Sequence, residues 1–328
     1  MGQVIGIIGL YVDDLIVLVK DLKSIDFLHA ELVNKYNKVT IKKGDLHSFL
    51  GMVIDFRERE KKGVSFSMPN FIEEILNEND IKCSRASPAN SNLFEPNESS
   101  KPLGKKETSV FHSTVAKVLY LAKRIRPDLL LTTNVLSTKV QKPSEDDNDK
   151  LKRMLRYLYG TKHLCMHMNF IENDTRYYCY IDASLGVHQG VYGHTGMVLM
   201  FGGAAILCKS TKQKIVVKST AEGELVALSD MAGCAIHGRN FLYSLGIESQ
   251  CIIYQDNKAT ISMISNENIN DKSKHIKMRY YWLKEHVKSG EVSICYMDSG
   301  NMLADILTKP LQGKLFIYLR NKLLNKPR

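Results

Sequence analysis

The chain has 328 residues, of which 44% are apolar and 24% charged, and its formal net charge is +10. This composition excludes an intrinsically disordered chain and predicts a globular protein long enough for two domains. No apolar run reaches the roughly 18 residues of a membrane span, and the positive charge favours a polyanionic partner. The seven cysteines are scattered without a CxxC pair, which predicts reduced thiols and an intracellular, non-secreted protein.

The N-terminal stretch predicts a β-hairpin. Two apolar runs, 4–10 and 15–19, flank the sequence Tyr11-Val12-Asp13-Asp14. A plain aspartate-rich turn has the same composition. The length and apolarity of both arms nevertheless predict a buried hairpin that holds Asp13 and Asp14 in place.

Helical patterns dominate the next part of the chain. Apolar residues at helical spacing predict helices over 21–36 and 68–79, and three more over 111–159. The stretch 84–106 is rich in Ser, Pro, Asn and Lys, which is typical of a linker or extended loop. A basic cluster follows, formed by Lys152, Arg153, Arg156 and Lys162. It either binds phosphates or is a solvated helix face, and the sequence leaves both interpretations open.

From residue 176 onward, strand and helix patterns alternate. Three strands, one long helix and a parallel return strand predict a mixed sheet with helices packed on it. The strands are expected over 176–182, 191–201, 204–217 with a break, 251–256 and 291–297. The helices are expected over 220–245, 257–265, 274–289 and 301–309.

Two of these strands each deliver an aspartate at the carboxyl end. Apolar runs lead directly into Asp182 and, after Gln255, into Asp256. A buried carboxylate is costly unless it is paired, hydrogen-bonded or bound to a metal ion. Either acid alone is more simply explained as a helix cap. Two acids in matching contexts favour a metal site at the edge of an α/β sheet.

Two helices add further acids. Ser219 and Glu222 form a capping box at the start of the long helix, so Glu222 has a structural role and Glu224 is the candidate ligand. Asp305 lies one turn after Asn301, the expected N-cap of the last helix. Four carboxylates at close range take up protons unless cations neutralise them, and hard oxygen ligands suit Mg²⁺ or Mn²⁺.

Several motifs resemble those of copia-type LTR retrotransposon polyproteins. Residues 11–14 resemble the YVDD box of reverse transcriptases, and 47–54 resemble the FLG strand of the family. Residues 126–128 and 156–161 resemble the connection segment. The most specific matches are 274–280 and 303–310, the latter reading LADILTKP. The resemblance extends from Tyr11 to Leu324.

The resemblance implies the C-terminal part of such a polyprotein: the end of the reverse transcriptase palm, the connection and a ribonuclease H domain. The expected fold class is α/β, a ribonuclease H-like mixed sheet with flanking helices, preceded by a partial palm hairpin and a mainly helical thumb and connection segment. The expected domains are a partial reverse transcriptase (1–91), a linker (92–107), the connection (108–170) and the ribonuclease H-like domain (174–328).

The resemblance also implies chemistry. Asp182, Glu224, Asp256 and Asp305 match the catalytic acids of ribonucleases H, which hold two Mg²⁺ or Mn²⁺ ions and hydrolyse the RNA strand of an RNA–DNA hybrid. Ser184 and Leu185 depart from the family, where many copies have Asp and Trp. Lys274, His275 and Arg279 join the basic cluster as candidate nucleic-acid contacts. A retrotransposon protein is expected in the cytoplasm, within virus-like particles, or in the nucleus.

Asp13 and Asp14 match two of the three metal-binding aspartates of the polymerase. Only ten residues precede Tyr11, so we expect a truncated polymerase part that is inactive alone and that needs the N-terminal part of a reverse transcriptase as partner. Two alternatives remain: the C-terminal fragment of an active RNA-directed DNA polymerase, and a catalytically inactive remnant that only binds nucleic acid.

Overall fold

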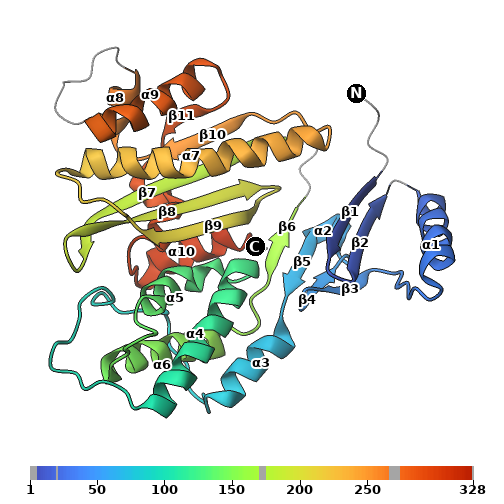
Figure 1. Cartoon of the computed structure of the whole chain (residues 1–328), viewed down its shortest axis with the longest axis horizontal. Helices are drawn as coiled ribbons and strands as arrows, with labels where there is room; N and C mark the ends of the chain where they lie inside the picture. The colour runs from blue at the N-terminus through green and yellow to red at the C-terminus, as the bar shows by residue number, and fades with distance from the viewer. Residues whose placement is uncertain (1–5, 20, 170–174, 266–273, 327–328) are drawn as a thin grey trace.

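The computed structural model describes residues 6–19, 21–169, 175–265 and 274–326 (Figure 1). Three sheets organise these residues: a two-stranded sheet, a four-stranded sheet in the order β3-β4-β5-β6, and a five-stranded sheet in the order β11-β10-β7-β8-β9. Among the helices of the described residues, none has both the length and the apolar composition of a membrane-crossing segment.

The N-terminal hairpin forms as expected, but it is not buried. Its elements are β1 (Gly6–Tyr11), β2 (Asp14–Val19) and α1 (Leu22–Tyr36). Tyr11 pairs with Asp14 across the turn, yet the side chain of Leu10 is 70% exposed and both aspartates are exposed. The expectation of a buried hairpin was wrong because two strands and one helix without buried residues provide no second layer.

The stretch 47–54 is a hairpin rather than one strand. Leu50 and Gly51 both have positive φ, 53° and 74°, the backbone of a tight two-residue turn. The sheet is completed by a strand from much later in the chain, β6, which pairs with β5. The elements are β3 (Leu46–Phe49), β4 (Met52–Asp55), α2 (Arg59–Lys62), β5 (Val64–Ser67), α3 (Pro69–Glu78) and β6 (Met166–Met168).

The three helices expected over 111–159 are present. They are α4 (Lys105–Arg124), α5 (Leu130–Ser137), which follows the short turn η1 (Pro127–Leu129), and α6 (Glu145–Gly160). Residues 81–104 contain no helix or strand apart from an isolated bridge between Pro102 and Ser144, as their turn-rich composition predicted.

The five-stranded sheet has the predicted topology. β7, β8 and β9 are antiparallel neighbours, and β10 returns parallel to β7 with Tyr254 opposite Tyr180. Its strands are β7 (Tyr177–His188), β8 (Tyr192–Phe201), β9 (Ala204–Lys212), β10 (Cys251–Gln255) and β11 (Ser293–Tyr296). Its helices are α7 (Thr220–Ser244), α8 (Lys258–Ser265), α9 (Lys274–Lys288) and α10 (Gly313–Leu323).

Helices cover both faces of this sheet (Figure 1). On one face, Cys179, Ile181 and Leu199 pack in a core with α7 and α9. On the other face, Val198 and Met200 share a core with α10 and with α4, α5 and α6. Because the helical segment and the sheet share this second core, the two parts are packed as neighbours rather than separated.

Three expectations near the C-terminus and in β7 need correction. The helix predicted over 301–309 is two short 3₁₀ turns, η2 (Ser299–Asn301) and η3 (Leu303–Leu307), because Met302 between them has an extended backbone. Asn301 therefore ends a turn and is not an N-cap. β7 continues to His188, so Asp182 lies within the strand rather than at its end. Helix α10 was not anticipated.

Candidate metal centre

Three carboxylates meet beside the five-stranded sheet. Asp182 is on β7, Glu224 is in the second turn of α7, and Asp256 directly follows β10. One oxygen of each lies within 4.8 Å of the others. β10 stops beside the middle of β7, and α7 packs across β7, which brings the three acids together from separate parts of the chain.

Burial and mutual repulsion make this group costly to ionise. Burial raises the pKa of Asp182, whose side chain is 1% exposed. Burial, followed by the charges of Asp182 and Asp256, raises the pKa of Glu224 to about 9. A divalent cation bound among the three acids would offset both effects, and carboxylate oxygens are the ligands that Mg²⁺ and Mn²⁺ prefer. The residues present therefore fit such an ion.

Neutral side chains orient two of these acids. The amide Nε2 of Gln255, which is fully buried, donates to Glu224 Oε2 at 3.2 Å, and its Oε1 accepts from the backbone of Asn257. The hydroxyl of Ser299 donates to Asp256 Oδ2 at 2.8 Å. These bonds fix the carboxylates before any ion binds.

The fourth acid, Asp305, stands apart from this group of three. It lies on η3, and its Oδ1 accepts from Lys309 Nζ at 2.8 Å. Burial, and then the charge of Asp182, raises its pKa to about 7 although Lys309 opposes the shift. Thr308 donates to the second oxygen of Asp182, so the segment 305–309 contacts β7 directly.

A glycine lets this segment approach the sheet. Gly196 on β8 is paired with Asp182, and a Cβ there would lie 2.7 Å from Thr308 Cγ2 and 2.8 Å from the carbonyl oxygen of Ala304. Ser184, the departure from the family pattern, donates to the carbonyl of Thr308 at 3.2 Å. Both residues position the segment that carries Asp305.

The two glutamates of α7 occupy the different places that the sequence predicted for them. Ser219 accepts from the backbone N–H of Glu222 as predicted, but Glu222 Oε2 accepts from the N–H of Lys218 at 2.8 Å rather than from that of Ser219, so the return bond of the predicted capping box is displaced by one residue. Glu222 thus helps to cap the helix, while Glu224 lies in the acidic group. The metal-binding roles of Asp182, Glu224, Asp256 and Asp305 stay a prediction.

The other candidate residues are scattered. Asp13 and Asp14 lie on the exposed hairpin, and in the described residues no third acid, histidine or cysteine joins them. In the basic cluster, Arg153 donates to Ser87, whereas Lys152 is exposed. Arg279 is paired with Asp230 of α7. The side chains of Lys274 and His275 lie outside the described part of the structure.

Sequence reasoning missed Gln255, Thr308 and Lys309. None of the three is a carboxylate ligand itself; each donates a hydrogen bond to one of the carboxylates. The spacing of Asp305 and Lys309 was the available signal, because residues four apart can form an ion pair.

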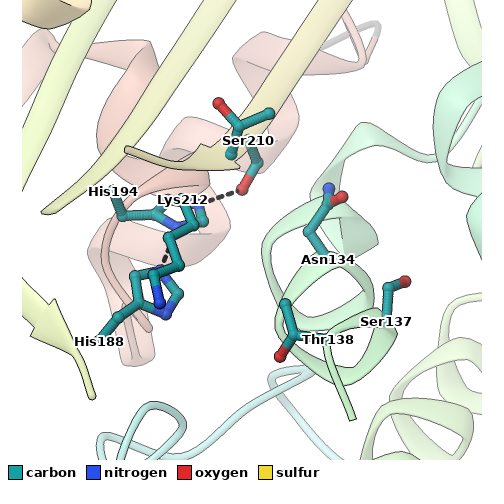
Figure 2. Close-up of a pocket in the computed structure, with 8 residues that line it drawn as sticks. Asn134, Ser137, Thr138, His188, His194, Ser210 and Lys212 are labelled. Carbon is teal, nitrogen blue, oxygen red and sulfur yellow. Dashed lines mark hydrogen bonds between the residues drawn. The ribbon is translucent and has the colours of Figure 1, made fainter. Parts of the chain in front are cut away.

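A second polar group lies near the end of β7 (Figure 2). His188 Nε2 and His194 Nδ1 are 2.8 Å apart, His194 Nε2 and Ser210 Oγ are 2.7 Å apart, and Ser210 donates to the carbonyl of Leu307. These residues, with Lys212, face Asn134, Ser137 and Thr138 across a cavity of about 240 Å³ between the sheet and α5. The hydrogen-bonded histidines therefore link this cavity to η3.

Comparison with solved structures supports the α/β fold described above. The structure of the foamy viral protease-reverse transcriptase in complex with RNA/DNA hybrid covers 89% of this chain with 36% of its own, at a TM-score of 0.50 and 11% identity. The foamy viral protease-reverse transcriptase dRH in complex with double-stranded DNA also reaches a TM-score of 0.50, covering 89% of this chain and 46% of its own at 13% identity. The expected ribonuclease H-like α/β fold with a reverse transcriptase segment is confirmed.

Sequence relatives narrow the class further. No protein-family model matches. The retrovirus-related Pol polyprotein from transposon TNT 1-94 of Nicotiana tabacum is 29% identical over 94% of this chain and 24% of its own length. The retrovirus-related Pol polyprotein from transposon RE1 of Arabidopsis thaliana is 29% identical over 98% of this chain and 22% of its own length. The transposon Ty1-BR Gag-Pol polyprotein of Saccharomyces cerevisiae is 27% identical over 96% of this chain and 19% of its own length. The resemblance to retrotransposon Pol polyproteins of the copia and Ty1 type is confirmed, and the chain spans a quarter or less of their length.

Proposed function

We propose that this chain hydrolyses the RNA strand of RNA–DNA hybrids by two-metal-ion catalysis, as one step of retrotransposon reverse transcription. The observation that carries the proposal is the approach of Asp182, Glu224 and Asp256 to within 4.8 Å on a ribonuclease H-like sheet. The relatives are Pol polyproteins, and the foamy viral structure contains an RNA/DNA hybrid, which agrees with this substrate.

The four acids share one task in this proposal. Asp182, Glu224, Asp256 and Asp305 hold two Mg²⁺ or Mn²⁺ ions, which when bound activate a water molecule and stabilise the departing oxygen. Gln255 keeps Glu224 oriented toward the centre. The net charge of +10 and the basic candidates Lys152, Arg156 and Lys162 favour a polyanionic strand. The 2′-hydroxyls of RNA distinguish it from DNA.

The test is cleavage of a hybrid with labelled RNA. We expect cleavage with Mg²⁺ or Mn²⁺ and none with EDTA. Asp182→Asn and Asp256→Asn should each lower the rate by about a hundredfold or more, the scale for losing one electrostatic group of an active site. The exposed Asp26→Asn on α1 is the matched control. Undiminished cleavage by both site variants would remove the assignment, and absence of cleavage by the unchanged chain would favour a non-catalytic nucleic-acid-binding remnant.

The hairpin supports a second proposal, that the chain is the C-terminal part of a reverse transcriptase. β1 and β2 present Asp13 and Asp14 together at one turn, as the YVDD resemblance predicts. In this proposal polymerisation requires the preceding part of a reverse transcriptase as partner, in the virus-like particle or nucleus where the element replicates. Primer extension by this chain with and without that partner distinguishes the two proposals.

A further inference from the structure

Lys309 places a positive charge inside the proposed metal centre. Its Nζ is 2.8 Å from Asp305 Oδ1 and 3.4 Å from Asp182 Oδ1, so one ammonium bridges η3 and β7. The two carboxylates are 7% and 1% exposed, whereas the lysine side chain is 39% exposed. The ammonium is therefore held by two buried carboxylates, while the lysine side chain as a whole stays partly open to water.

The Lys309 ammonium distinguishes two positions among the four acids. The first lies among Asp182, Glu224 and Asp256, and the second lies between Asp182 and Asp305. Of the three converging acids, Glu224 and Asp256 bond to the neutral side chains of Gln255 and Ser299, and only Asp182 is in contact with Lys309, at 3.4 Å. Between Asp182 and Asp305, the chain supplies its own cation. The first position is ready for a metal ion, and the second already holds an ammonium.

A divalent ion and the ammonium cannot share the second position. Mg²⁺ binds carboxylate oxygens at about 2.0–2.1 Å, so an ion held by Asp182 and Asp305 would compete with Lys309 for these two carboxylates. The two cations would also repel at this distance in a poorly hydrated site. Lys309 has a long flexible stem and a partly exposed position, so it can move into water when an ion arrives.

We propose that Lys309 is a displaceable internal counter-ion that makes the two metal ions bind unequally. The first ion enters among Asp182, Glu224 and Asp256, and the second binds only when the ammonium leaves Asp182 and Asp305. Lys309 is then a positioning residue that holds Asp305 in place while the second ion is absent. The inference rests on the proposed metal-dependent function.

The test counts Mn²⁺ ions bound to the full chain by titration calorimetry. We expect a tight first site and a weaker second site in the unchanged protein. Lys309→Met should tighten the second site by about tenfold or more, since it removes the competing charge. It should also lower the melting temperature in EDTA and increase the rise produced by Mn²⁺. Lys314→Met, which removes an exposed lysine of α10, is the control and should change neither quantity.

Equal second-site affinities in the unchanged and Lys309→Met proteins, or a weaker second site in the variant, would overturn the inference. If Lys309→Met does not fold, side-chain NMR of the unchanged protein decides. The Lys309 ammonium signal should undergo its larger shift with the second equivalent of Mg²⁺, and a shift completed with the first equivalent or none at all contradicts displacement. Failure of the proposed function is read separately, from hybrid cleavage: it appears as undiminished cleavage by Asp182→Asn and Asp256→Asn or as no cleavage by the unchanged chain, whereas the inference is decided by Mn²⁺ binding.

Discussion

The side chain of Arg126 is fully buried, and its positive charge is paired with Asp128, two residues further along the chain. Its guanidinium donates to both oxygens of Asp128 at 2.9 and 2.8 Å and to the backbone and side chain of Thr161. Tyr157 donates to Asp128 at 2.6 Å. Burial alone would raise the pKa of Asp128, but Arg126 outweighs it and the pKa is lowered. These residues belong to the connection motifs of 126–128 and 156–161, so in this structure those motifs make one buried network.

The first prediction at this scale concerns stability. Asp128→Asn should lower the free energy of unfolding by about 3–5 kcal/mol, because it leaves Arg126 charged, buried and without its partner. Tyr157→Phe should cost about 1–3 kcal/mol, since it removes one buried hydrogen bond. Urea unfolding measures both. Asp80→Asn is the control, as Asp80 pairs with Lys82 in full exposure and its loss should change little. A small effect of Asp128→Asn would mean that water reaches Arg126.

The second residue-scale prediction separates the two glutamates of α7. Glu224→Gln should abolish most hybrid cleavage and the Mn²⁺-induced rise in melting temperature, because it removes one of three converging charges. Glu222→Gln should keep both, since its amide oxygen can still accept from Lys218. The opposite ranking would show that the register of the site is displaced by two residues.

At the scale of elements, three strands are tied to η3 through the histidine pair. Burial, then the charge of His188, lowers the pKa of His194 to about 3. Burial, then Lys212 and Lys139, lowers the pKa of His188 to about 4. Ser210 uses its proton on Leu307, so His194 must donate from Nε2 and accept from His188 at Nδ1. Both histidines are therefore neutral in the folded protein.

This neutrality predicts acid sensitivity. The unfolded chain takes up protons near pH 6.5, whereas the folded chain resists until well below it, so stability falls as pH drops below 6.5. For His194 alone the loss at pH 5 relative to pH 7.5 is about 2 kcal/mol. His194→Gln should reduce the pH dependence of urea unfolding by that amount. The control is His112→Gln, an exposed histidine of α4. An unchanged slope in His194→Gln would contradict the assignment of a neutral pair.

Strands could be predicted where burial enforces the pattern, although the end of β7 was missed because residues 185–188 lie beyond its buried run. β7, β8 and β10 read as apolar runs because both faces of their sheet are covered, and Ser219 marked the start of α7 by its capping. The short turns could not be predicted, because the path from Ser299 to Leu307 depends on contacts with β8 at Gly196. The N-terminal hairpin was placed correctly, but the apolarity of its strands does not reveal whether a covering layer exists.

At the scale of the whole molecule, the site depends on tertiary packing that no local pattern encodes. Residues from β7, α7, β10 and η3 form the centre, and they are separated by more than 120 positions between Asp182 and Thr308. The four acids could be identified from the sequence because carboxylates are the usual protein ligands of Mg²⁺ and Mn²⁺. Lys309 was not, because a lysine in a cluster of acids has meaning only once the acids are seen to surround it.

The arrangement of the molecule also separates the hairpin from the proposed metal centre. β1, β2 and α1 lie at one side of the molecule, beyond the four-stranded sheet as seen from β7, β8 and β9 (Figure 1). Asp13 and Asp14 are exposed and have no third ligand among the described residues. Two-metal phosphoryl transfer needs enough ligands to hold both ions and a surface that positions the incoming nucleotide. The two exposed aspartates alone do not supply that set of ligands in the described part of the chain.

The last prediction follows from that separation. The double variant Asp13→Asn/Asp14→Asn should leave hybrid cleavage within about twofold of the unchanged chain, because exposed charges far from the centre are screened by water and salt. The 328-residue chain alone should not extend a primer on an RNA template. Both are measured on the same preparation, with Asp182→Asn as the variant that loses cleavage. Template-dependent nucleotide incorporation that disappears in the double variant would show that the exposed hairpin assembles a working polymerase centre.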